Sequence, residues 1–199
     1  MPQIPAALAD HPDRLRWNER YRAAGYVPSF TAHPLAAQAL SMPLPDGPVA
    51  DLACGPSGSA LLAAAEGRLV SAVDASDVGL GLLEQEARRR HLDGRITLVL
   101  ADLARWRPDA AGYALVLCTG YWDRATFAAA AGAVRPGGII GWEAFTQAAR
   151  RDRPQLPPEW CVGPREPAVL LPAGFEVVSQ DEIGPEPATR RRLLARRRD

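Results

Sequence analysis

The stretch PVADLACGPSGS, residues 48–59, decides the fold. It begins with a short apolar run, 48–53, which carries Asp51 and enters a turn of glycine, proline and serine. The alanine-rich segment that follows, 59–66, is typical of a helix. A buried strand, a tight turn and a helix in this order form the opening unit of an open α/β sheet.

The same alternation continues on the C-terminal side of this stretch. Apolar runs predict four more strands and periodic segments predict two more helices, the strands at 69–73, 96–101, 113–118 and 139–145 and the helices at 77–91 and 123–134. Two closing strands are predicted at 175–183 and 189–195, and the short turn at Gly184 favours an antiparallel pair there. We therefore expect an α/β three-layer sandwich with a seven-stranded, mostly parallel sheet.

The flanking segments are less regular. Two helices are expected before the first strand, at 13–24 and 35–40, and six prolines make 153–172 a surface loop with one short helix at 166–171. We expect a single domain over 1–199, divided into an N-terminal helical cap, 1–45, and a Rossmann-like core, 46–199.

Composition excludes several classes of protein. The chain has 199 residues, 47% of them hydrophobic, without an apolar run long enough to span a membrane or a secretory leader, so we expect no membrane partner. Three unpaired cysteines favour free thiols and a cytoplasmic location.

The 23 arginines balance 23 acidic residues, so clusters such as 190–192 are interpreted as solvated and no nucleic-acid partner is expected. The three histidines lie in separate segments, so no metal site is expected.

Acidic side chains follow three of the predicted strands. In open α/β sheets, ligands bind beyond the carboxyl ends of the strands, where Asp51, Asp74 and Asp102 are expected. Asp74 lies 23 residues after Asp51, a position from which a carboxylate can accept both hydroxyl groups of a ribose. This arrangement predicts a nucleoside ligand, although each aspartate alone is also a common helix cap.

Charge decides which nucleoside is expected. Asp51 beside the turn would repel the pyrophosphate of a dinucleotide, and the loop offers only Gly55 and Gly58 in place of the G-x-G-x-x-G pattern. An acidic strand end suits a cation instead. S-adenosylmethionine carries both an ammonium and a sulfonium, so the loop favours that cofactor.

Several motifs together carry a family resemblance. DLACG (51–55), VDAS (73–76), ADL (101–103), RPGG (135–138) and WEAF (142–145) resemble, in order and spacing, the motifs of class I S-adenosylmethionine-dependent methyltransferases. WNERY, residues 17–21, is similar to the W-x-x-R-Y segment of small bacterial tellurite-resistance and thiopurine methyltransferases, where it closes over the cofactor. The resemblance implies the strand order 3-2-1-4-5-7-6 with the last strand antiparallel.

The resemblance also implies site residues. Asp51 and the backbone of Ala53 and Gly55 would hold the methionyl end, and Asp74 would hold the ribose. The remaining cofactor-binding residues would be Trp17, Tyr21, Ala75, Asp102, Leu103 and Cys118. Apart from the resemblance, Tyr121, Trp122 and Glu143 are expected to face the acceptor. Tyr121 and Glu143 are the polar candidates for a base if the acceptor needs deprotonation, and the sequence assigns neither.

Two departures from the family pattern refine the expected function. Ala53 and Ser57 stand where the family loop has glycines, and TGYW (119–122) differs from the Asn/Asp-Pro-Pro-aromatic pattern of nucleobase methyltransferases. We therefore expect in-line methyl transfer to a small-molecule acceptor. A non-catalytic nucleoside-binding domain and a nicotinamide-dependent oxidoreductase remain as alternatives, and the sequence leaves the oligomeric state open.

Overall fold

The computed structural model describes residues 4–186 and 189–198. Seven strands form one sheet in the order β3-β2-β1-β4-β5-β7-β6, which confirms the predicted order. In chain order the strands are β1 (Val49–Leu52), β2 (Val70–Asp74), β3 (Ile96–Leu100), β4 (Tyr113–Thr119), β5 (Val134–Phe145), β6 (Phe175–Ile183) and β7 (Arg190–Arg197). β7 runs antiparallel to both of its neighbours, while β1 to β5 pair in parallel, as the resemblance implied.

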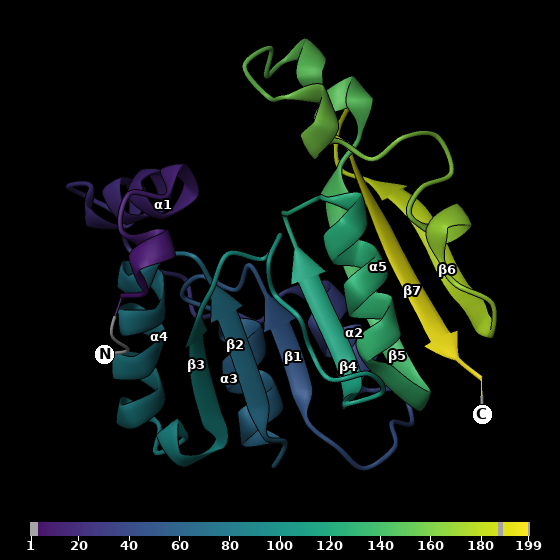
Figure 1. Cartoon of the computed structure of the whole chain (residues 1–199), viewed down its shortest axis with the longest axis horizontal. Helices are drawn as coiled ribbons and strands as arrows, with labels where there is room; N and C mark the ends of the chain where they lie inside the picture. The colour runs from purple at the N-terminus through teal and green to yellow at the C-terminus, as the bar shows by residue number, and fades with distance from the viewer. Residues whose placement is uncertain (1–3, 187–188, 199) are drawn as a thin grey trace.

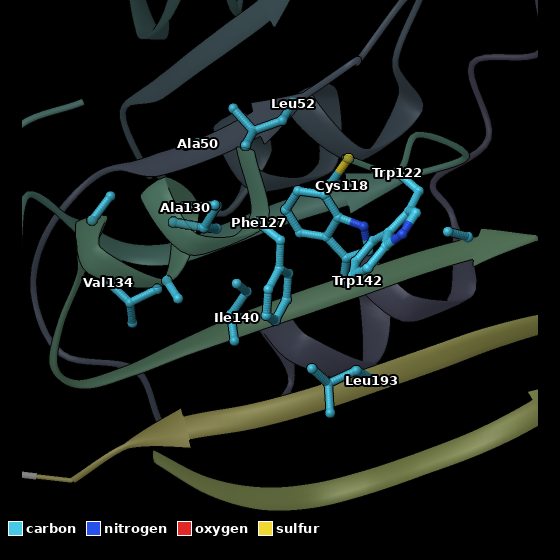
Figure 2. Packing of buried hydrophobic residues seen from close by; sticks show 14 of the residues in the cluster. Ala50, Leu52, Cys118, Trp122, Phe127, Ala130, Val134, Ile140, Trp142 and Leu193 are labelled. Carbon is cyan, nitrogen blue, oxygen red and sulfur yellow. The ribbon is translucent and has the colours of Figure 1, made fainter. Parts of the chain in front are cut away.

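Helices cover both faces of this sheet. They are α1 (Pro12–Arg22), α2 (Pro34–Leu40), α3 (Gly58–Ala65), α4 (Asp77–Arg89) and α5 (Arg124–Ala133). Figure 1 shows α5 in front of the sheet and α2 and α3 behind it. The front cluster centres on Phe127, Trp142 and Trp122, whose rings meet between α5 and β5 (Figure 2). The two apolar faces explain why the central strands are almost wholly buried.

Local capping fixes where the helices begin. Ser57, Ser76 and Asp123 stand at the N-caps of α3, α4 and α5, and each side chain accepts a hydrogen bond from the backbone N–H three residues later. The helices after β1 and β2 are therefore capped by serines. Asp51 and Asp74 are not the N-cap residues of these helices; Asp51 accepts from the Ser57 hydroxyl, and Asp74 accepts from the backbone N–H groups of Gly55 and Ser76.

The first 45 residues do not form one cap. Leu35, Ala36 and Ala39 of α2 are fully buried and join the cluster behind the sheet, so α2 belongs to the core. α1 lies near the carboxyl ends of β2 and β3, where it packs on α4 (Figure 1). The predicted cap is thus corrected to a shorter segment that ends with α1.

The segment between β5 and β6 rises above the ends of β5 and β7 (Figure 1). It contains three short 3-10 helices, at Gln147–Arg151, Pro158–Trp160 and Ala168–Leu170. The helix predicted over 166–171 is thus a single turn, because prolines without an N–H interrupt the segment. In the described part of the chain, no helix is long and apolar enough to cross a membrane.

Candidate functional site

The loop after β1 keeps the expected turn although two glycines are replaced. Ala53 adopts the left-handed conformation, with φ of 50°, and Gly55 does the same with φ of 53°. Ser57 takes a role that glycine lacks, because its hydroxyl caps α3 and donates to the carboxylate of Asp51 over 2.5 Å. Ala53 therefore adopts a conformation that favours glycine, and Ser57 adds a hydrogen bond beneath the loop.

Two carboxylates lie under this loop. Asp51 and Asp74 are 3% and 7% exposed. Burial raises the pKa of Asp51 to about 6, partly offset by the hydrogen bond from Ser57, and the charge of Asp74 raises it further. Burial also raises the pKa of Asp74 to about 6, against hydrogen bonds from the backbone N–H groups of Ser76 (2.7 Å) and Gly55 (2.8 Å). The pair gives this end of the site a negative charge that favours a cation.

A buried latch holds α1 beside these carboxylates. The guanidinium of Arg14 donates to Asp77 at the start of α4 over 2.7 Å. The amide of Asn18 also donates to Asp77 over 2.7 Å, and its oxygen accepts a hydrogen bond from Ser76 over 2.6 Å. Arg14, Asn18 and Asp77 are each less than 10% exposed. The latch fixes α1 over the N-terminus of α4.

Tyr21 at the end of α1 occupies a slot between two glycines. A Cβ at Gly55 would lie 2.4 Å from the Tyr21 hydroxyl, and a Cβ at Gly79 would lie 2.8 Å from its ring. Burial and the nearby charge of Asp74 raise the pKa of Tyr21 well above its ordinary value, so it stays a neutral phenol. Tyr21 also stacks with Trp17, with 5.8 Å between ring centroids. The aromatic pair forms one wall of the site.

A cavity of about 390 Å³ opens at the carboxyl ends of the strands. Six predicted residues line it: Trp17, Tyr21, Ala53, Asp74, Tyr121 and Trp122. A smaller pocket of about 40 Å³ shares Asp74 with it and adds Ala75, Asp102 and Leu103, the residues predicted for the adenine. The structure therefore brings the predicted ribose and adenine residues together, and the predicted acceptor residues Tyr121 and Trp122 lie in the same cavity.

Four predicted residues lie outside the lining of both pockets. Asp51 is buried beneath the loop, and Gly55 is a buried residue of the loop itself. Cys118 is fully enclosed in the core, where burial raises its thiol pKa well above the ordinary value. Glu143 is 1% exposed. Direct contact of these side chains with a ligand stays a prediction, and for Asp51 the structure shows Ser57 as its immediate partner.

Glu143 is tied to three basic side chains. It pairs with His33 at 3.4 Å, Arg190 at 3.2 Å and Arg192 at 2.8 Å. Burial alone would raise the pKa of Glu143, but the hydrogen bonds and charges of His33 and Arg192 lower it to about 2. Such a carboxylate is a poor proton acceptor at neutral pH. The hypothesis that Glu143 serves as a base is therefore not supported by its surroundings.

The cavity also contains residues that the sequence did not reveal. His33 and four arginines line it, Arg16, Arg20, Arg153 and Arg190. The interpretation of 190–192 as a solvated cluster is wrong for Arg190, which lines the cavity, and for Arg192, which binds buried Glu143. The signal available in the sequence was the alternation of β7, which brings every second residue to the same face of the sheet.

Comparison with known proteins identifies related sequences and folds. Residues 49–138 match a family model described as a methyltransferase domain. No curated protein matches the chain in a sequence comparison.

Three solved structures illustrate the fold. A structure on the conversion of a disulfide bond into a thioacetal group during echinomycin biosynthesis superposes with a TM-score of 0.69 at 19% identity, covering 93% of this chain and 91% of that one. The CcbJ methyltransferase from Streptomyces caelestis gives 0.66 at 16% identity, with coverages of 87% and 94%. Magnesium protoporphyrin IX methyltransferase from Synechocystis PCC 6803, with bound S-adenosylmethionine, gives 0.64 at 20% identity, with coverages of 92% and 89%.

These findings agree with the family resemblance at a general level. Residues 49–138 match a methyltransferase domain, and the solved structures, at 16–20% identity, share the fold of this chain. The similarity to the tellurite-resistance and thiopurine type stays a prediction that rests on residues 17–21.

Proposed function

We propose that this protein transfers a methyl group from S-adenosylmethionine to a small-molecule acceptor. The observation that carries the proposal is the pocket formed by Asp74, Ala75, Asp102 and Leu103 beside the main cavity. Its residues come from the loops after β2 and β3, which are neighbours in the sheet. This is where an open α/β sheet binds a nucleoside.

The residues present fit this cofactor. Each carboxylate offers about four lone-pair sites, and Asp74 uses two of them for the N–H groups of Gly55 and Ser76. The remaining sites can accept the hydroxyl groups of a ribose. Asp51 lies too deep to line the cavity, so we assign it an electrostatic role: its charge beneath the loop favours the ammonium and sulfonium of the cofactor.

The cofactor, when bound, supplies a methyl group that is already activated by the sulfonium. The protein then has to align the acceptor with the carbon–sulfur bond and exclude water. Trp17 and Tyr21 cover the cavity on the side of α1, and Tyr121 lines both pockets. Burial raises the pKa of Tyr121 to about 12, so its hydroxyl is a hydrogen-bond donor at neutral pH. We propose that Tyr121 orients the acceptor and that no dedicated base is needed.

Calorimetry with two ligands and two variants tests the proposal. S-adenosylhomocysteine carries a charged homocysteinyl end, with the ammonium and carboxylate of the cofactor, whereas methylthioadenosine keeps the adenine, the ribose and a thioether but no charged end. A hydrogen bond to a charged group contributes about 1.5–3 kcal/mol, so Asp74→Ala should weaken both ligands by roughly ten- to a hundredfold. Asp51→Asn should weaken S-adenosylhomocysteine and leave methylthioadenosine nearly unchanged.

NAD provides the control ligand, and melting curves show whether each variant is folded. Binding of S-adenosylhomocysteine without binding of NAD is the expected result for the wild-type protein. The proposal is refuted if NAD binds and S-adenosylhomocysteine does not, or if a folded Asp74→Ala variant binds both nucleosides as tightly as the wild type.

A further inference from the structure

We propose that the methyl acceptor is a small anion with a flat apolar body, and that Arg153 and Arg190 hold its anionic group. The inference rests on the proposed function, because it assigns the end of the same cavity that lies away from the nucleoside pocket. A carboxylate and a phosphate monoester share the required chemistry, since both offer paired oxygens to a guanidinium.

The two arginines reach the cavity from distant parts of the chain. Arg190 is the first residue of β7 and pairs across the sheet with Phe145, the last residue of β5. Arg153 comes from the irregular segment after β5. Both guanidinium groups lie over the Phe145 ring, at 4.5 Å for Arg190 and 4.7 Å for Arg153 from its centroid. The ring thus restrains each guanidinium where it lines the cavity, which reduces the entropy lost when a ligand binds.

Positive charge exceeds negative charge at this end of the cavity. Glu143 is shared by Arg190 and Arg192, with the His33 imidazole as a third neighbour. Arg153 pairs with no carboxylate among residues 4–186 and 189–198. Three arginines therefore face a single carboxylate, and an anionic ligand would supply the missing negative charge.

The acidic residues of the cavity are committed elsewhere. Asp13 pairs with Arg16 at 2.9 Å on α1. Asp74 accepts backbone N–H groups under the nucleoside pocket. Within the described residues, neither carboxylate forms an ion pair with Arg153 or Arg190.

The strand order separates this arginine pair from the nucleoside pocket. β4 and β5 lie between β1 and β7. Because neighbouring strands are about 4.8 Å apart, β7 lies roughly 14 Å from β1. The walls between are aromatic, with Tyr121, Trp122, Phe145 and Trp160 lining the cavity. An acceptor with a flat apolar body can therefore extend from the arginines toward the methyl group.

Matched naphthalene probes test this inference. We would measure 1-naphthoate, 1-naphthyl phosphate and neutral 1-naphthamide by calorimetry against the protein saturated with S-adenosylhomocysteine. At least one anion should bind tenfold or more tightly than the amide, and added salt should weaken the anion more than the amide. Comparison of the two anions then distinguishes a carboxylate site from a phosphate site.

Three variants test whether Arg153 and Arg190 cause the preference for the anion over the amide. Arg153→Gln and Arg190→Gln should each reduce the preference for the anion to less than threefold, with S-adenosylhomocysteine affinity unchanged. Arg151→Gln is the matched control, because Arg151 is exposed and lies outside the cavity lining. If Arg190→Gln does not fold because Glu143 loses a partner, Arg153→Gln alone decides, since Arg153 is exposed and its side chain forms no ion pair within the described part of the chain.

Contrary results separate this inference from the proposed function. If S-adenosylhomocysteine binds but the amide equals both anions, or no anion binds, the anionic acceptor is refuted and the methyltransferase proposal stands. If the arginine variants weaken S-adenosylhomocysteine and leave the anion preference intact, the arginines serve the cofactor, which also refutes the inference. If S-adenosylhomocysteine itself does not bind, both proposals fail.

Discussion

The two ends of the cavity are built in different ways. At the end beside β1 and β2, two buried carboxylates lie under a short loop, and their pKa values rise to about 6. At the end beside β5 and β7, arginines surround Glu143, whose pKa falls to about 2. We propose a cationic ligand for the first end and an anionic ligand for the second, although both ends belong to one cavity.

The two ends also differ in how the chain encodes them. Asp51, Gly55 and Ser57 lie within seven residues, so the strand, the turn and the helix cap are specified locally. The arginine end needs Phe145, Arg153 and Arg190, which meet only after β7 has paired with β5. Residues close in sequence therefore form the proposed cofactor end, while residues brought together by long-range pairing form the proposed acceptor end.

The largest effect is expected from the latch at the nucleoside end. Asp77→Ala removes the partner of Arg14 and Asn18, both of which are buried. Breaking a buried ion pair by removal of one partner destabilises by about 3–5 kcal/mol. Urea unfolding should show this loss, together with weaker S-adenosylhomocysteine binding.

Arg124→Gln is the matched variant at the other end. It breaks the pair of Arg124 with Glu166, in which Arg124 is largely exposed. Exposed ion pairs contribute less than about 1 kcal/mol. Equal losses for the two variants would contradict the view that α1 is held by a buried latch.

The sequence predicted the residues at the end beside β1 and β2 far better than the residues at the end beside β5 and β7. Strand ends at Asp51 and Asp74 follow from apolar runs and turn residues, which depend on neighbours in sequence. The latch was missed because Arg14 and Asp77 are 63 residues apart and follow no periodic pattern. Arg190 was misread because a surface strand and a cavity wall have the same alternation, and only the packing of the 146–172 segment distinguishes them.

The contributions of Asp51 and Glu143 to the free energy of unfolding should change with pH in opposite directions. Because the folded-state pKa of Asp51 is raised from 3.8 to about 6, its contribution to stability is greatest below pH 3.8 and is lost as the pH rises through 6. Asp51→Asn keeps an oxygen that can accept from Ser57. It should therefore become more stable than the wild type by up to about 3 kcal/mol at pH 7, with little difference at pH 3.5.

Glu143→Gln should have the opposite effect on stability, because it should be less stable than the wild type at pH 7. The folded-state pKa of Glu143 is lowered from 4.5 to about 2, so its stabilisation is present above pH 4.5 and is lost as the pH falls through 2. Unfolding free energies measured from pH 3.5 to 7 test both signs. A destabilised Asp51→Asn variant at pH 7 would show that Asp51 is not held in an unfavourable charged state.

A smaller effect is expected at Ser57. Ser57→Ala removes the cap of α3 and the hydrogen bond to Asp51. A cap contributes about 1 kcal/mol and a hydrogen bond to a charged group somewhat more, so we expect a loss of about 2 kcal/mol in urea unfolding. Ser41→Ala is the control, because the Ser41 hydroxyl donates to an exposed carbonyl of Gln38. A loss no greater than that of the control would exclude a structural role for the serine that replaces glycine.

The smallest effect is expected at Ala53, the other replaced glycine of the loop. Ala53 has a φ of 50°, a conformation that costs a residue with a Cβ about 1–2 kcal/mol. Ala53→Gly removes that strain but increases the freedom of the unfolded chain by about 0.5–1 kcal/mol. The two terms nearly cancel, so the free energy of unfolding should change by less than about 1 kcal/mol, in the stabilising direction.

Ala128→Gly, on the exposed face of α5, has no such strain and should lose about 1 kcal/mol. If both glycine variants lose the same stability, Ala53 is not strained, and the loop at the nucleoside end tolerates alanine for another reason.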